Sequence, residues 1–258
     1  FIQNHGEALL GPDVVAVGGY QSLSFQLTKL GDYYIEFNPS SPTVLTRLNT
    51  RFQYFDVSVV KGVQPQLGRL WSRNWDLSNY SFANSVQSSV FVYSTDGVVS
   101  ELDMNGLQPY GFEIACNNTG PVDTGSPLLD RQSKAGKLTY ALYNIFLNDP
   151  DNLAYPTGTF STLGSRPAYM SGCSGSYCIN VDYDGGGYAE VVLDFNNNSV
   201  NDGDDIVLSA NVLGGYHCFA WDGKDAAGND VPHAFSINIE ASILAGLTHY
   251  PVYDAENH

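Results

Sequence analysis

The chain has 258 residues with 27 acidic and 11 basic side chains, so its formal net charge is −16. Binding to nucleic acid or to anionic lipid needs clustered lysine and arginine, and this composition excludes both classes. Hydrophobic residues make up 43% of the chain, too many for a disordered acidic tail, and no apolar run is long enough to span a bilayer. Nothing at Phe1 resembles a signal peptide, so we expect a processed or excised chain.

The charge is concentrated in the last third of the sequence. Residues 1–165 carry 14 acids and 9 bases, a net of −5, whereas residues 166–258 carry 13 acids and 2 bases, a net of −11. Like charges at this density repel one another unless they are solvated or bind a cation. We therefore predict two modules, 1–165 and 166–258, with the boundary in the Gly- and Ser-rich stretch 157–166.

Strands are predicted throughout the first module, because polar and apolar residues alternate with a period of two. The expected strands are 32–37, 52–60, 89–94, 98–103 and 111–116. Residues 95–97, Thr-Asp-Gly, are typical of a hairpin turn between the third and the fourth of these. No long stretch combines a helical period with caps, and the large loops suggest a jelly-roll or a related β-sandwich.

The second module has shorter and more regular strands, expected at 177–181, 188–193, 205–209, 216–221 and 234–240. Short strands separated by turn signals at intervals of about ten residues suggest an immunoglobulin-like sandwich. The predicted fold class is thus all-β, with two consecutive β-sandwich modules, the first jelly-roll-like and the second immunoglobulin-like.

The strongest chemical signal lies between the expected strands 188–193 and 205–209. Oxygen-bearing side chains occupy the first, third, fifth, ninth and twelfth places of one loop, and a carbonyl is available at the seventh: Asp194, Asn196, Asn198, Asp202, Asp205 and Val200. This is the ligand spacing of an EF-hand-type calcium loop. Ser199 stands where such loops have glycine, and Asp205 where they have glutamate. The sequence predicts a calcium site on a β scaffold, and the alternative is a solvated Asn/Asp turn.

The four cysteines indicate whether the protein lies in an oxidising or a reducing cellular compartment. Cys173 and Cys178 bracket a short loop that a disulfide would close, whereas the pairing of Cys116 and Cys218 cannot be assigned from sequence. The alternative is that the cysteines are buried free thiols. An even cysteine count with few lysines favours an extracellular compartment, and the spacing does not suit zinc.

Two further patterns concern catalysis and sugar binding. Residues 123–126, Asp-Thr-Gly-Ser, match the aspartic protease signature, but that chemistry needs a second such aspartate and the chain has none. Asp-Thr-Gly is also an ordinary turn, so we predict no catalytic residues and no enzyme. Trp71 and Trp75 are the candidates for a glycan-binding platform, although indole rings that fill the sandwich core are the expected alternative.

Several motifs resemble a known family. Residues 68–75, 105–112 and 145–151 resemble the N-terminal region of large Bacteroidetes surface proteins, adhesin-like proteins that are exported by the type IX secretion system and associated with gliding motility. The Trp-Asp-Gly hairpin at 221–229 is similar to immunoglobulin-like domains of flagellar hook-capping proteins. The resemblance implies a secreted or surface-attached, non-enzymatic protein and carries over no catalytic residues.

The expected function is therefore that of a non-enzymatic cell-surface or extracellular structural or adhesion segment, stabilised by calcium. Its expected partners are cell-surface or extracellular matrix components, glycans or further copies of the chain. Two other classes stay open. One is a carbohydrate-binding module or glycan-active enzyme that uses Trp71 and Trp75 with a carboxylate pair. The other is a self-assembling extracellular filament subunit with exposed sheet edges.

Overall fold

The computed structural model describes residues 24–35, 57–78, 85–108, 111–124, 127–132, 134–135, 139–173, 175–250 and 252–254. The chain divides into two compact units, Phe1–Ser58 and Val59–His258. In the first unit the described residues form no strand or helix, including 32–35 of the expected strand 32–37. Residues 36–37, and 52–56 of the expected strand 52–60, lie outside the described ranges.

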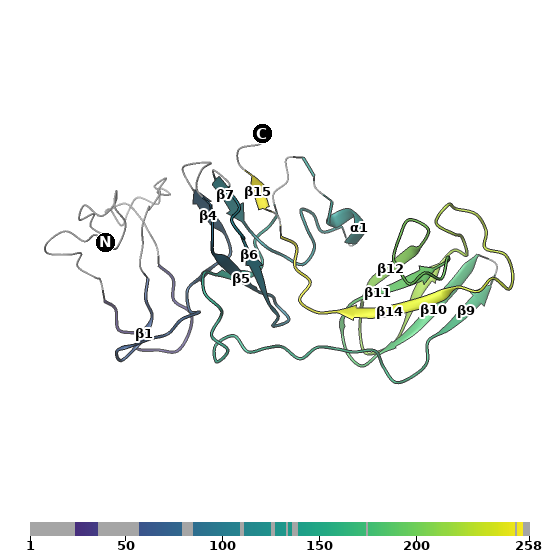
Figure 1. The fold of residues 1–258 in the computed structure, drawn as a ribbon. Helices are drawn as coiled ribbons and strands as arrows, with labels where there is room; N and C mark the ends of the chain where they lie inside the picture. The colour runs from purple at the N-terminus through teal and green to yellow at the C-terminus, as the bar shows by residue number, and fades with distance from the viewer. Residues whose placement is uncertain are drawn as a thin grey trace. The chain divides into compact units, whose positions relative to one another are not determined.

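The predicted all-β class is confirmed within Val59–His258, where the strands form several antiparallel sheets (Figure 1). Among the residues that the structure describes, one helical turn, α1 (Pro127–Asp130), interrupts them. No helix within the described ranges is long and apolar enough to cross a bilayer. A two-stranded ribbon, β1 (Val60–Lys61) and β2 (Gln64–Pro65), precedes the larger sheets.

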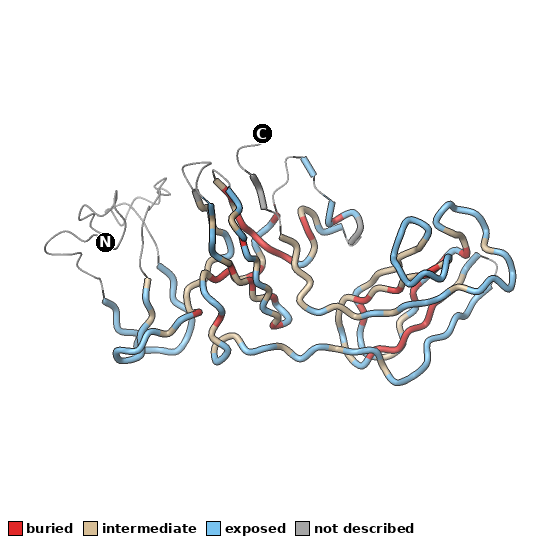
Figure 2. Tube along the Cα trace, viewed as in Figure 1, coloured by how far each residue is buried: buried red, intermediate tan, exposed pale blue. Residues whose placement is uncertain are grey.

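Two sheets enclose a first hydrophobic cluster. One sheet has the order β3 (Trp71–Ser72), β8 (Asn144–Phe146), β5 (Ser89–Tyr93) and β6 (Val99–Asp103); the other has β15 (Val252–Asp254), β7 (Gly111–Ile114) and β4 (Trp75–Ser78). Alternate residues of β5 and β7 are buried, as period-two patterning requires (Figure 2). The buried members of this first cluster are Val90, Val92, Met104, Phe112, Ile114, Cys116, Tyr143 and Ile145.

Two other sheets enclose a second cluster. Their orders are β13 (Gly215–Trp221), β10 (Ser176–Tyr183) and β9 (Tyr169–Cys173), and then β12 (Ile206–Val212), β11 (Gly187–Asp194) and β14 (Asn238–Leu244). The central strands β10 and β11 contribute most of the buried side chains (Figure 2). The second cluster consists of Ile179, Val181, Tyr183, Ala189, Val191, Leu193, Val212, Phe219 and Trp221.

The end of the chain returns to the first cluster. β15 pairs with β7, so that Val252 lies opposite Ile114. The backbone N–H of His249 donates to the Asn117 carbonyl at 2.7 Å. His249 and residues 252–254 belong to the expected module 166–258, yet they pair with Asn117 and with β7 of the expected module 1–165. The boundary near residue 165 stays a prediction, and the sequence did not indicate this return.

The expected hairpin of the first module is confirmed as β5 and β6. Ser94 donates its N–H to the Val98 carbonyl at 2.9 Å, and Gly97 closes the turn with a φ of 82°. A Cβ at Gly97 would stand 2.5 Å from the backbone nitrogen of Gly158, so glycine is also required for this close approach. The turn residues therefore fix both the hairpin and its contact with the following chain.

Candidate functional site

The loop of residues 194–205, called the acidic loop below, joins β11 to β12. Asp194 is the last residue of β11, and only 1% of its surface is exposed. Its carboxylate accepts the backbone N–H of Asn198 at 3.3 Å and that of Ser199 at 3.0 Å. The loop is thus wound around a buried carboxylate at its first position.

Ser199, at the sixth position of the acidic loop, has a left-handed backbone conformation, which its residue type did not predict. Ser199 has a φ of 58° and Asn197 a φ of 56°, both in the left-handed region. EF-hand-type loops place glycine at the sixth position because the chain turns sharply there. Ser199 therefore makes a left-handed turn without glycine, supported by the hydrogen bond of its N–H to Asp194.

Three of the predicted ligands come together in the middle of the loop. The Asp202 carboxylate accepts the Asn198 side-chain amide at 2.9 Å and the Asn196 amide at 3.3 Å. It also accepts the backbone N–H of Asp204 at 2.9 Å. The third, fifth and ninth positions of the loop therefore lie next to one another, with the amide N–H groups of Asn196 and Asn198 facing the Asp202 carboxylate, while their amide oxygens accept the backbone N–H groups of Asn198 and Val200.

The remaining predicted ligands lie at the ends and the rim of the loop. Asp205 accepts the backbone N–H of Phe195 at 3.2 Å and that of Asp202 at 3.1 Å, which ties the two ends of the loop together. Val200 is 59% exposed. Over the described ranges no three His, Cys, Asp or Glu side chains gather as a metal-binding group. The structure therefore does not gather Asp194, Asp202 and Asp205 into one cluster of carboxylates, and a calcium site in this loop would also need amide and carbonyl oxygens.

Hydrogen bonds keep two carboxylates of the loop in the charged form. Burial alone would raise the pKa of Asp194, but backbone N–H groups of Ser199, Asn197 and Asn198 outweigh it, and the pKa is lowered. The pKa of Asp202 is lowered by the N–H of Asp204 and by the side-chain amides of Asn198 and Asn196. Both groups are anionic at neutral pH, as cation ligands must be.

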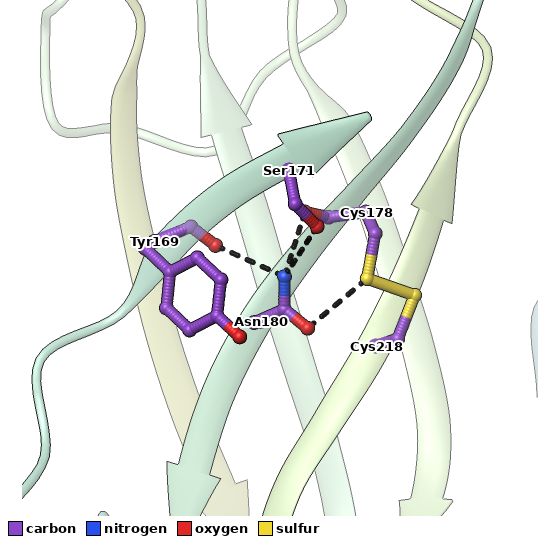
Figure 3. The surroundings of a disulfide bond; sticks show 5 residues. All are labelled: Tyr169, Ser171, Cys178, Asn180 and Cys218. Carbon is purple, nitrogen blue, oxygen red and sulfur yellow. Dashed lines mark hydrogen bonds between the residues drawn. A yellow bond between two sulfur atoms is a disulfide. The ribbon is translucent and has the colours of Figure 1, made fainter. Parts of the chain in front are cut away.

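The disulfide differs from the sequence-based pairing. Cys178 in β10 is bonded to Cys218 in β13, with a Cα–Cα distance of 5.3 Å (Figure 3). The expected pair of Cys173 with Cys178 was wrong, since Cys173 is an exposed free thiol. Cys116 is a buried free thiol, and burial raises its pKa to about 12.

The strand register explains which cysteines meet. Cys178 lies opposite Ala220 and Cys218 opposite Asn180, so the bonded residues are diagonal neighbours across β10 and β13. Across β9, Cys178 lies opposite Ser171 and Cys173 opposite Ser176, which places Cys173 on the other diagonal. The Cα–Cα distance of 5.3 Å between Cys178 and Cys218 lies within the range that a disulfide requires.

Asn180 occupies the face of β10 that carries the disulfide, away from the second cluster. Its side-chain amide donates to the Ser171 hydroxyl at 2.9 Å and to the Tyr169 carbonyl at 3.4 Å (Figure 3). Its carbonyl oxygen lies 3.2 Å from the sulfur of Cys178. Asn180 thus holds the edge strand β9 against β10 beside the disulfide.

The two tryptophans of the expected glycan platform differ in their surroundings. Trp75 packs against the first cluster, and its indole N–H donates to the Ile145 carbonyl at 3.0 Å. Trp71, in β3, lies opposite Phe146 of β8 and is half-buried. The surroundings of Trp75 are those of a core residue, and the platform stays a prediction.

The Asp-Thr-Gly-Ser motif is described only at its first two residues, because Gly125 and Ser126 lie outside the described ranges. Thr124 donates its backbone N–H, at 2.8 Å, and its hydroxyl, at 2.6 Å, to Asp130. Asp130 itself is only 2% exposed. These contacts fasten the segment before α1 to the end of that helix.

Sequence reasoning missed an ion pair in the second module, between a buried aspartate and a half-exposed arginine. Asp182 in β10 is 6% exposed and is paired with the Arg166 guanidinium, while the Arg166 backbone N–H donates to it at 3.2 Å. Arg166 also lies over the ring of Tyr216, 4.1 Å from its centroid. The hydrogen bond from Arg166 is the main cause of the lowered pKa of Asp182. The available signal was a charged residue in a strand whose alternate positions, Ile179, Val181 and Tyr183, belong to the core.

We expect Asp182→Asn to destabilise the folded chain at neutral pH. The pKa of Asp182 in the folded state lies below the ordinary value of 3.8. The stability that its charged carboxylate contributes is therefore fully present above pH 3.8 and is lost as the pH falls through the folded-state pKa. Urea unfolding along a pH series checks this: the stabilities of wild type and variant should differ at neutral pH and converge in strong acid. Asp230→Asn is the control, since that carboxylate is 89% exposed in its ion pair with Lys224. A difference that does not change with pH would contradict the expectation.

Comparison with known proteins adds no assignment: no protein-family model, no curated protein and no solved structure matches the chain. The resemblance to type IX-secreted surface proteins therefore stays a prediction from sequence motifs. Function has to be inferred from the chain's own residues.

Proposed function

We propose that the chain is a non-enzymatic extracellular or cell-surface structural or adhesion segment whose second module is stabilised by calcium. The observation that carries the proposal is the acidic loop, where Asn196, Asn198 and Asp202 converge and Asp194 is buried at the loop's first position. The Cys178–Cys218 disulfide supports an oxidising compartment. Calcium and an oxidising environment are both present outside the cell, where a secreted adhesin of the kind implied by the motif resemblance would work.

The proposal includes two β-sandwich modules. Each hydrophobic cluster is shared by two sheets, which is how a sandwich core is built. In the second module the first, second and fifth strands, β9, β10 and β13, form one sheet, as strands A, B and E do in immunoglobulin domains. The third and sixth strands, β11 and β14, pair in the facing sheet like strands C and F. This order supports the immunoglobulin-like assignment, while the jelly-roll-like assignment of the first module rests on its sequence.

Calcium would act on this module by reducing repulsion between its carboxylates. Residues 166–258 carry a net charge of −11, and three acids of the acidic loop, Asp202, Asp204 and Asp205, lie within four positions. A divalent cation bound by the loop would hold β11 and β12 in register where they separate. Extracellular calcium-binding modules work at roughly 0.1–1 mM affinity, which suits calcium outside the cell.

We expect calcium to raise the Tm of the chain relative to the same protein in a chelator. At a concentration tenfold above the dissociation constant, linkage gives about 1.4 kcal/mol of added stability. The measurement is thermal unfolding during calcium titration, with magnesium as the comparison ion. Asp202→Ala should abolish the shift, whereas Asp204→Ala, at a loop position that is not a predicted ligand, should retain it.

Two results would overturn the calcium role: no shift of the Tm in the wild-type protein, or the same shift in Asp202→Ala.

The location of the protein is tested separately, by protease treatment of intact source cells. A surface protein is cleaved while the cells stay sealed. Protection of the chain until the cells are lysed would contradict the extracellular proposal.

A further inference from the structure

A cleft within the unit Val59–His258 is not explained by the calcium proposal. Its volume is about 390 Å³, within the usual range of about 300–1,000 Å³ for small-ligand sites. The lining comes from the β5–β6 turn, from segments on both sides of α1, from residues 159–161 and from the ends of β11, β12 and β14. Segments distant in sequence therefore meet at one concave surface.

Ionic and polar contacts fix the walls of the cleft. The Arg131 guanidinium lies 3.3 Å from the Glu190 carboxylate and stands over the ring of Tyr188, 5.4 Å from its centroid. The Asp96 carboxylate accepts the backbone N–H of Gly246 at 2.6 Å. The cleft is thus tied at two places, which limits the rearrangement that a ligand would have to induce.

Neutral polar groups face the cleft. The lining includes the amides of Asn118 and Asn211 and the hydroxyls of Thr119 and Ser161. The Asn118 side-chain oxygen accepts the Tyr140 hydroxyl at 3.3 Å, and the Ser161 hydroxyl donates to the Gly186 carbonyl at 2.7 Å. Asn211 is exposed, and none of the described residues hydrogen-bonds to its side chain. Its amide offers a ligand a donor and an acceptor together.

An aromatic side chain supplies an apolar surface beside these groups. Phe160 lines the cleft and is 40% exposed. A sugar ring has one face of C–H groups, which packs against an aromatic ring, and a rim of hydroxyls, which needs amide and hydroxyl partners. The lining of the cleft combines both kinds of group.

The negative charge of the cleft lining favours neutral glycans over acidic ones. Three carboxylic acids, Asp96, Asp123 and Asp130, line the cleft, and its cation Arg131 is already paired with Glu190. A sialylated or sulfated glycan would be repelled by this surface, whereas a neutral one would not.

We propose that the cleft binds a neutral oligosaccharide, with Asn211 and Asn118 hydrogen-bonding to its hydroxyls and Phe160 packing against a ring face. The inference rests on the proposed adhesion function, for which it names the class of ligand. It also moves the sugar site away from Trp71 and Trp75, which are not part of the cleft lining.

The test uses the full chain on an array of neutral glucose-, galactose-, mannose- and N-acetylglucosamine-based oligosaccharides, with sialylated and sulfated counterparts. Hits are then titrated by calorimetry. Asn211→Ala and Phe160→Leu should each raise the dissociation constant about threefold to tenfold, the effect of one lost hydrogen bond or ring contact. Asn148→Ala, an exposed amide outside the lining, should not change it.

Trp71→Leu separates the cleft from the tryptophan platform, because it removes the indole and keeps an apolar side chain. Loss of binding in Trp71→Leu with full binding in Asn211→Ala and Phe160→Leu would overturn the proposal. Binding of acidic glycans alone, or of none, would overturn it as well. The calcium shift and the protease treatment are independent readouts, so a failure of the cleft is distinguishable from a failure of the proposed function.

Discussion

Replacing Leu193 by alanine is expected to lower the free energy of unfolding by about 2–5 kcal/mol. Leu193 is fully buried in the second cluster, on the central strand β11. It lies opposite Ile206 of β12 and Ile239 of β14, so three strands meet around its side chain. Deletion of the isobutyl group loses its transfer free energy and leaves a cavity that three paired strands cannot readily close.

Chemical denaturation followed by far-UV circular dichroism measures this loss. Leu213→Ala is the matched control, because that leucine is 80% exposed, and its effect should stay within about 0.5 kcal/mol. Ile145→Ala is the counterpart in the first cluster, where Ile145 is fully buried. If the two clusters unfold independently, calorimetry should show each variant lowering a different transition. Equal losses in Leu193→Ala and Leu213→Ala would contradict the placement of the core.

Removal of the disulfide is expected to cost about 4 kcal/mol, the loop-closure value for a bridge spanning 40 residues. The bridge joins β10 to β13, and the intervening chain contains the acidic loop, so the reduced unfolded chain gains much conformational freedom. Cys218→Ser removes the bridge, and unfolding in urea compared with the wild type measures the loss.

Cys173→Ser is the control for this experiment, since its thiol is free and exposed, and it should leave the stability nearly unchanged. Peptide mapping without reductant gives an independent reading and should recover Cys178 linked to Cys218. A peptide linking Cys173 to Cys178, together with a large loss in Cys173→Ser, would contradict the bridge described here.

Strands with clear alternation were predictable because the pattern is local. Residues 89–103 contain two alternating runs and a Gly-containing turn, and they form the hairpin of β5 and β6. β8 and β9 were not expected, because β8 is very short and β9 carries no alternation of burial. Residues 234–237 were expected to be part of a strand, but the chain turns at Ala234, with a φ of 67°, and β14 begins at Asn238.

The acidic loop could be predicted from neighbouring residues in the sequence, whereas the disulfide could not. The loop is contiguous, so the spacing of its oxygen side chains could be read along the chain, whereas the left-handed conformation of Asn197 and Ser199 could not. The disulfide depends on the register between β10 and β13, which is set by core packing across the sheet. Proximity in sequence favoured Cys173, whereas the register selected Cys218.

The concentration of charge in residues 166–258, the all-β class and the acidic loop were determined by the sequence alone, because composition, period and loop spacing are properties of neighbouring residues. The return of β15 to β7, the Arg166–Asp182 pair, the cysteine partner and the cleft were decided only by the tertiary structure. Each of these brings together segments far apart in the chain, and no local pattern records which segments will meet when the sheets pack.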